Sequence, residues 1–301
     1  MVSAAAAGRI RAAVTATDYI PNLVAGSLAS ARRRMIGLLV SDLVYPNFNE
    51  AVETIASGLG AAGSNVMLCV TGGDPRRATQ LVTQMLSWRI DAMIAWTPIS
   101  AEGERLLRRS GVTVIQICDP AARPVDIGIG FDQTELGAAL ARFARQRGYR
   151  APHFVATVGN HSERTRDRFM QEWRRCSKEG GATEQLIETP PSFQLGRHVY
   201  ARLKGLRKRP DLVVCSSDYL AQAVIIEAQA DGRSVPGNLA VMGLGDSPVA
   251  REMRPAITTV DIHTHRMAPE ILRILEARGR GQKVPRQHIN LGFGIIARES
   301  A

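Results

Sequence analysis

Short apolar runs alternate with amphipathic segments along the first part of the chain. Residues 34–42 (RMIGLLVSD) form one continuous apolar run that ends in polar residues, which is typical of a strand buried on both faces. Residues 48–62 instead carry apolar side chains at helical spacing, through Val52, Ile55 and Leu59. Such an order of strands and helices predicts a parallel sheet with helices on both faces. The alternation continues through strands at 65–70, 91–96 and 112–118 and helices at 74–89 and 101–111.

The same alternation occurs a second time. Strands are predicted at 126–131, 153–159, 186–190, 211–217 and 239–246, with helices at 133–148, 163–180, 195–207 and 218–232. A helix at 263–281 and a last strand at 287–297 complete the chain. No Pro/Gly-rich linker separates the two halves. The fold class predicted is therefore α/β, with two doubly wound parallel-sheet lobes that are joined by several crossings.

Polar residues follow several of the predicted strands. In open parallel sheets, ligands bind beyond the carboxyl ends of the strands, so these residues are candidates for a binding site. The alternative for each is a capping role at the start of the following helix. The candidates are Ser41, Asp42, Trp96, Thr97, Asp119, Ser217, Asp218, Gly245 and Asp246.

Motifs that mark catalysis or cofactor binding are missing from the sequence. No G-x-G-x-x-G follows the first strand, and there is no phosphate-binding Lys loop, G-x-S-x-G or H-E-x-x-H. Nothing pairs a nucleophile with a base. We therefore expect a binding protein that is not an enzyme and that has no cofactor.

The histidines and cysteines favour structural roles over metal binding. His263 and His265 flank Thr264, where a loop or helix-start position is the favoured interpretation. Three of the four cysteines lie in apolar runs, as buried thiols of a reducing cytosol do. None lies within metal-ligand spacing of another (Cys69, Cys118, Cys176 and Cys215). We therefore expect no metal site.

Length and composition narrow the class of protein. The 301 residues suffice for two domains, and 45% hydrophobic residues are normal for a globular protein. No apolar run is long enough to span a membrane. The Ala-rich start is interrupted by Arg9 and Arg11, so a secretory signal is not expected. These features predict a cytoplasmic protein.

The basic charge is concentrated at the start of the chain. The formal net charge is +10, and residues 1–34 hold five arginines against Asp18 alone. A basic cluster of this kind favours a polyanionic partner, although an Arg-rich genome bias can account for the overall charge. The weakly helical segment before the first strand, residues 18–34, can be a linker, a signal or a nucleic-acid-binding arm.

Five stretches of the sequence together resemble the LacI/GalR family of bacterial transcription regulators. The first is AAVTATDYIPNLVAGSLASARRRMIGLLVSD (12–42), which resembles the junction between headpiece and core. The resemblance covers about 290 residues and is nearest to the gluconate-type branch. The other stretches are FDQTELGAALARFARQRGYR (131–150), LVVCSSDYLAQAVIIEAQADGRSVPGNLAVMGLGD (212–246), RPAITTVDI (254–262) and INLGFGIIARES (289–300).

The resemblance implies a DNA-binding hinge helix after Pro21 and Asn22. In the family, this helix inserts a leucine from each subunit into the minor groove, which bends the DNA. Leu28 corresponds to the wedge, and Ala25 is the small residue that allows close approach. Arg32 and Arg33 can contact phosphates or can simply be solvated. The implied DNA-binding residues are Tyr19, Pro21, Asn22, Ala25, Leu28, Arg32 and Arg33.

The resemblance also implies an effector site between lobes of periplasmic-binding-protein type. Ser217-Asp218 stands where the family usually has Asn-Asp, and residues 243–246 (GLGD) replace Gly-Phe-Asp-Asp. The family's effector arginine, four residues before an aromatic residue, corresponds in uncertain register to Arg164 or Arg166 before Phe169. The implied effector-binding residues are Tyr45, Asp119, Arg164, Arg166, Ser217, Asp218 and Asp246.

The start of the sequence departs from the family pattern. Residues 4–14 resemble the third helix of the family's helix-turn-helix headpiece, and two preceding helices are missing. A cut chain, a misassigned start codon or a naturally headless member would each explain this. The expected parts are a headpiece remnant and hinge helix (1–33), a first lobe (34–131 plus about 262–286) and a second lobe (132–261 plus about 287–301).

The sequence as a whole predicts a LacI-type DNA-binding transcriptional regulator that acts as a repressor. We expect a homodimer that binds a DNA operator, with a sugar or sugar acid such as gluconate as effector and no membrane partner. The alternatives are a solute-binding protein of the same fold and a doubly wound enzyme.

Overall fold

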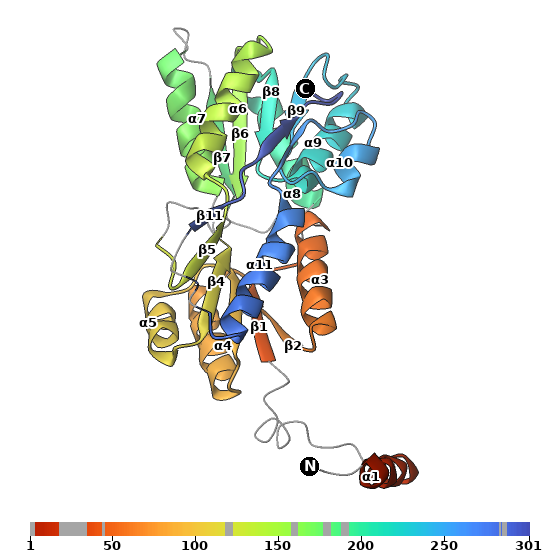
Figure 1. The fold of residues 1–301 in the computed structure, drawn as a ribbon. Coiled ribbons are helices and arrows are strands. Elements are labelled where there is room, and N and C mark those ends of the chain that lie inside the picture. The colour runs from red at the N-terminus through yellow and green to blue at the C-terminus, as the bar shows by residue number, and fades with distance from the viewer. Residues whose placement is uncertain are drawn as a thin grey trace.

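The computed structural model describes residues 4–17, 35–43, 46–117, 123–157, 162–176, 182–187, 193–282, 284 and 288–301. From Met35 onward these residues form two lobes, each built on a parallel sheet with helices on both faces (Figure 1). The predicted fold class is confirmed. Ahead of the lobes, α1 (Ala4–Ala16) is a helix, as expected for residues 4–14. None of the described helices has the length and apolar character needed to cross a membrane.

The sheet of the first lobe has six parallel strands in the order β11-β5-β4-β3-β1-β2. β1 pairs with β2 on one side and with β3 on the other, so the first strand lies inside the sheet. Five of its six residues are buried, which explains its continuous apolar run. The strands are β1 (Met35–Val40), β2 (Asn65–Val70), β3 (Ala92–Trp96), β4 (Thr113–Ile117), β5 (Ile127–Gly130) and β11 (His288–Asn290).

Two helices cover each face of this sheet. α3 (Pro46–Ala61) and α11 (Thr264–Gly279) pack on one face through Val52, Ile55 and Ile271. α4 (Pro75–Ser87) and α5 (Ala101–Ser110) pack on the other. Local sequence sets their ends: Asp74 and Ser100 accept hydrogen bonds from backbone N–H groups of the first turns, and Gly111 ends α5 in the left-handed region.

The sheet of the second lobe has four parallel strands in the order β7-β6-β8-β9. They are β6 (Pro152–Thr157), β7 (Thr183–Ile187), β8 (Leu212–Cys215) and β9 (Ala240–Met242). α6 (Gln133–Gln146) and α7 (Ser162–Cys176) cover one face. The other face is covered by α8 (Phe193–Gly205), α9 (Asp218–Ala230) and the short α10 (Pro248–Glu252).

Three crossings join the lobes, at residues 131–132, 262–263 and 291–293 (Figure 1). The last two flank β10 (Thr259–Asp261) and β12 (Gly294–Ile296), an antiparallel pair that packs on the second lobe through Val260 and Ile295. The crossings place the carboxyl ends of the first sheet's strands towards the second lobe, which is the expected place for a ligand site.

The predicted strand at 287–297 is wrong as a single element. β11 pairs with β5 in the first sheet, whereas β12 pairs with β10 beside the second sheet. Between them Gly292 has a φ of 72°, and its N–H donates to Asn290 Oδ1 at 2.9 Å. This turn splits one apolar run between two lobes, so residues 288–290 belong to the first lobe and not to the second.

Three smaller differences concern the second lobe. β7 begins three residues before the predicted strand at 186–190. α10 and β10 were not predicted from the sequence. Both are short, at five and three residues, and so carry too little periodicity to be recognised.

Candidate functional site

Hydroxyl groups tie together the strand ends of the first lobe. Ser41, after β1, donates to Thr97 Oγ1 at 3.1 Å, and Thr97 shares a hydrogen bond of 2.9 Å with Thr71. Thr71 and Thr97 are buried, and Thr71 Oγ1 also accepts from the N–H of Gly73 at 3.1 Å. The preceding Trp96 ring packs on Phe48, with centroids 3.9 Å apart. These hydrogen bonds hold together the strand ends of the first sheet that face the second lobe.

The two residues of the strand-end pair Ser217-Asp218 in the second lobe have different structural roles. Ser217 is the N-cap of α9, and its hydroxyl accepts from the N–H of Leu220 at 3.2 Å, so the capping alternative holds for this side chain. Asp218 is only 2% exposed. Its carboxylate accepts hydrogen bonds from Thr259 Oγ1 and, at 2.7 Å, from the N–H of Ser247. Asp218 thus ties α9 to β10 and to the start of α10.

The Asp218 carboxyl packs closely against the backbone at Gly243. A Cβ at Gly243 would lie 2.2 Å from Asp218 Oδ1. Burial raises the pKa of Asp218, and the charge of Asp246 raises it further, against the hydrogen bonds from Thr259 and Ser247. The carboxylate is therefore positioned to hold the β9–α10 turn and is turned away from solvent.

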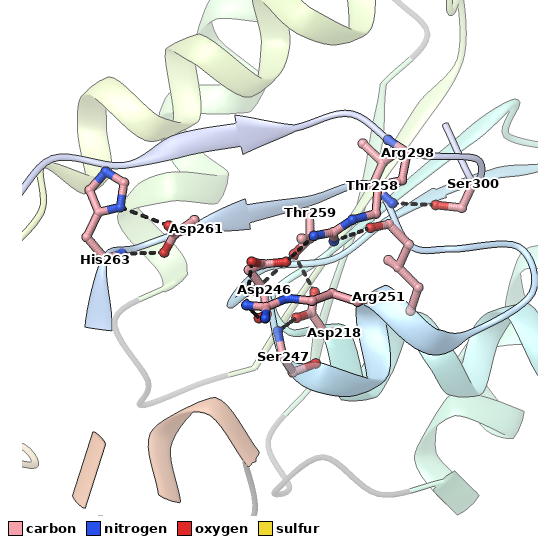
Figure 2. A network of polar contacts seen from close by, with 11 residues as sticks. Asp218, Asp246, Ser247, Arg251, Thr258, Thr259, Asp261, His263, Arg298 and Ser300 are labelled. Carbon is pink, nitrogen blue, oxygen red and sulfur yellow. Dashed lines mark hydrogen bonds and ion pairs between the residues drawn. The ribbon is translucent and has the colours of Figure 1, made fainter. Parts of the chain in front are cut away.

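Asp246, in that turn, lies between two arginines (Figure 2). Its backbone is left-handed, with a φ of 49°. Arg251 of α10 donates to Oδ2 at 2.8 Å, and Arg298 of the C-terminal segment pairs with Oδ1. Arg298 also donates to the carbonyl of Ile257 at 3.0 Å, which fixes the guanidinium. One carboxylate and two guanidiniums leave the cluster with a net positive charge.

Acidic groups of both lobes act on the Arg251 guanidinium. The pKa of Arg251 is raised above its ordinary value by the hydrogen bond and charge of Asp246, and also by the charges of Glu50 in α3 and Asp261. Glu50 belongs to α3 of the first lobe and Asp261 to β10 beside the second lobe, so the pKa of this guanidinium depends on charges of both lobes. Because an arginine has five donors, the cluster retains N–H groups for an anionic or hydroxylated ligand.

The C-terminal residues build the rear of this cluster. Ser300 Oγ accepts from the N–H of Thr258 at 2.8 Å (Figure 2). It also donates to the carbonyl of Val241 at 2.6 Å. Thr258 Oγ1 in turn donates to the carbonyl of Ala301 at 3.0 Å. Sequence reasoning missed Arg298, because its partner lies 52 positions away and no local pattern marks the pair.

The two candidate arginines of α7 are placed differently. Arg164 is exposed in the first turn of the helix, next to the carboxyl end of β6. Arg166 is largely buried, with 12% of its side chain exposed, and pairs with Asp167 and, at 3.1 Å, with Glu184 of β7. Arg166 therefore stabilises the α7–β7 contact, and because Arg164 is the exposed one of the two, it is the better candidate for a ligand contact.

Several predicted site residues lie outside the described residues. For the effector site these are Tyr45 and Asp119, and for DNA binding they are Tyr19, Pro21, Asn22, Ala25, Leu28, Arg32 and Arg33. Of the predicted effector residues that are described, Asp218 and Asp246 are brought together, with Ser217 at the adjacent helix cap. The two arginines of α7 belong to the opposite face of the same sheet.

A family profile matches the second half of this chain, and a relative matches nearly all of it. The profile is described as "Periplasmic binding protein-like domain" and matches residues 141–301. The "HTH-type transcriptional regulator GntR" of Escherichia coli K12 is 28% identical over 300 residues, which cover 98% of this chain and 89% of the relative.

Two solved structures of transcription regulators resemble the structure of this chain. Transcription regulator GntR from Chromobacterium violaceum has a TM-score of 0.80 and 26% identity, and covers 89% of this chain and 99% of its own. A LacI family transcriptional regulator from Lactobacillus casei, solved with bound sucrose, has a TM-score of 0.75 and 24% identity with the same coverage.

Proposed function

We propose that this chain, which belongs to the LacI/GalR family of transcriptional regulators with a periplasmic-binding-protein-like core, is a DNA-binding regulator that senses a sugar or sugar acid between its lobes. In this proposal it acts as a repressor in a dimer. The effector changes how the lobes lie relative to each other, and this change orders or releases the hinge segments on DNA. DNA and effector are then coupled through one equilibrium.

One observation carries the proposal: the similarity to regulators extends over 98% of the chain, and so includes the segment ahead of the first lobe. The alternative is a solute-binding protein of the same fold. Its function would not explain the basic segment ahead of the first lobe. An enzyme is disfavoured because the relatives are transcriptional regulators and because the sequence has no cofactor loop. Binding of a labelled DNA duplex, measured by fluorescence anisotropy with and without effector, separates the regulator from the solute-binding protein.

The chemistry of the strand ends supports an oxygen-rich effector. The cluster of Asp246, Arg251 and Arg298 offers a carboxylate for sugar hydroxyls and guanidiniums for a carboxylate. Tyr45, Asp119 and Arg164 remain proposed contacts. The relative from Lactobacillus casei was solved with bound sucrose. Because the sequence resembles the gluconate-type branch of the family, gluconate is the first compound to test.

A panel of sugars and sugar acids, measured by thermal shift, tests the effector site. We expect one compound, with gluconate tried first, to raise the melting temperature of the wild-type chain. Arg164→Ala is expected to weaken this ligand about 10-fold or more, because a charge-assisted hydrogen bond contributes about 1.5–3 kcal/mol. Arg166→Ala is the matched control: it breaks the pair with Glu184 and lowers stability, but the ligand-induced shift should remain.

The outcomes of this panel are distinguishable. A shift that Arg166→Ala abolishes and Arg164→Ala preserves would reverse the assignment of the two arginines. A panel in which no sugar or sugar acid shifts the melting temperature contradicts the proposed effector class.

The edge of the first sheet supports the proposed homodimer. β2 is the edge strand, and Leu68 and Val70 on it are 43% and 37% exposed. We expect Leu68→Glu to shift the chain from dimer to monomer in sedimentation velocity, because the change places a charge in an apolar contact. Ile226→Glu, at a residue 41% exposed on α9, is the matched control and should leave the dimer intact. A monomeric wild-type chain, or equal effects of the two changes, would contradict this dimer.

A further inference from the structure

The crossing between β10 and α11 gathers three groups that the proposed function does not use. Asp261 is the last residue of β10, beside the second lobe. His263 is the N-cap residue of α11, and His265 lies in the first turn of that helix, which packs on the first lobe. The chain passes from one lobe to the other between these residues.

The three side chains converge in the structure. The His263 ring shares a hydrogen bond of 2.9 Å between Nδ1 and Asp261 Oδ2, and its backbone N–H donates to Asp261 Oδ1 at 2.7 Å (Figure 2). The His263 and His265 rings meet edge to face, with centroids 5.6 Å apart. One ligand atom of each of the three residues lies within 4.8 Å of the others.

The local backbone holds His263 in place. Its φ is 54°, in the left-handed region that residues other than glycine seldom adopt. The Asp261 carboxylate forms hydrogen bonds with both the backbone N–H and the ring of His263. Across the β10–β12 ladder, Asp261 pairs with Gly294, and a Cβ at that position would lie 4.0 Å from His263 Cε1, at ordinary van der Waals distance. The His263 ring therefore lies beside the β10–β12 ladder.

The sequence pattern favoured a structural role for these histidines and no metal site, but the convergence of the three side chains points the other way: we propose that Asp261, His263 and His265 form a binding site for a transition-metal cation of the Zn²⁺ or Ni²⁺ type. Two imidazoles and one carboxylate are donors that these cations prefer, whereas Ca²⁺ and Mg²⁺ take oxygen ligands. Asp261 acts either as a direct ligand or as the acceptor that fixes the tautomer of His263 and leaves Nε2 free for the ion. Water completes the coordination sphere.

The site is accessible and needs only small adjustments. The side chains of Asp261 and His263 are 25% and 20% exposed, and His265 is exposed, so an ion and its water can reach all three. Ligand atoms of a tetrahedral zinc site lie roughly 3.3 Å apart, given bonds of about 2.0 Å. The three ligand atoms now lie within 4.8 Å of one another, and His265, the exposed member, is the side chain that would have to move to reach this spacing.

The position gives a bound ion a mechanical consequence. It would connect the end of β10 to the first turn of α11, across the residues whose backbone must turn if the lobes move. Binding would therefore stiffen one of the three crossings. The site stands on its own residues and is independent of the effector and of DNA.

Isothermal titration of the metal-free chain, without an affinity tag, with Zn²⁺ and in parallel with Ni²⁺ tests the site. Accessible thiols are first alkylated, because Cys69 and Cys176 are only partly buried and can bind zinc. We expect one ion per chain. His265→Gln is expected to weaken binding at least tenfold, and Asp261→Asn about 10- to 100-fold. His198→Gln and His288→Gln, at exposed histidines far from the crossing in sequence, are the matched controls and should bind as the wild type does.

His265 is exposed, so its replacement should leave the fold intact, which far-UV circular dichroism checks. The imidazole resonances of His263 and His265 should shift on addition of Zn²⁺ while those of His198 and His288 stay in place. The proposal is overturned if the alkylated wild-type chain binds neither ion, if His265→Gln binds as tightly as the wild type, or if a control histidine carries the binding.

Discussion

Phe169→Ala is expected to lower the free energy of unfolding of the second lobe by about 3–5 kcal/mol. Phe169 is fully buried on α7, with its ring 5.3 Å from that of Phe154 in β6 and 6.1 Å from that of Trp173. Its removal deletes a large apolar surface and leaves a cavity in the middle of this group. The cavity cannot collapse easily, because α6 and α7 already touch: a Cβ at Gly137 would lie 2.3 Å from the carbonyl oxygen of Thr165.

Urea unfolding followed by tryptophan fluorescence and circular dichroism measures this loss. Phe143→Ala on α6 is the matched control, because this ring is only partly buried and should cost less. If the lobes unfold in separate transitions, only that of the second lobe should move. A loss for Phe169→Ala no greater than that for Phe143→Ala would contradict the assigned core of this lobe.

The order of strands and helices could be read from the sequence because each element carries its own periodicity. The run 34–42 and the helical spacing of Val52, Ile55 and Leu59 are local patterns, and both elements are found within a few residues of their predicted bounds. A strand that is buried on both faces can be recognised from its own continuous run of apolar residues. The order in which the strands pair was not predicted and comes from the structure.

What the sequence could not supply are contacts between distant segments. The apolar run 287–297 looked like one strand, and only its partners β5 and β10 reveal that it is two. The pair between Asp246 and Arg298 joins residues 52 positions apart. Similarly, Arg164 and Arg166 are equivalent in sequence, and Glu184 on a neighbouring strand distinguishes them.

Asp218 was predicted as an effector ligand, and its geometry instead points to a positioning role that a mutation can separate. Asp218→Ala leaves the N–H of Ser247 and the hydroxyl of Thr259 without their acceptor in a buried place. Each unsatisfied group costs about 1–3 kcal/mol, so we expect a loss of about 2–6 kcal/mol in the free energy of unfolding. Asp218→Asn keeps an oxygen for the Ser247 N–H and an amide donor for the Thr259 hydroxyl, and should lose much less. Equal losses for the two variants in urea unfolding would contradict this role.

The pH dependence of the same pair of chains gives the second test of Asp218. Burial raises the pKa of this carboxyl in the folded chain, whereas in the unfolded chain the pKa stays near its ordinary value of about 3.9. The folded state therefore binds the proton more tightly, and its stabilisation is complete below the unfolded pKa and is lost as pH rises through the raised one. Asparagine does not titrate, so the stability of the wild type relative to Asp218→Asn should fall as pH rises above about 4, by up to about 1.4 kcal/mol per pH unit. Urea midpoints of both chains measured from pH 4 to 8 check this, and a difference that stays constant or grows in favour of the wild type would show that the carboxyl is not buried as the structure has it.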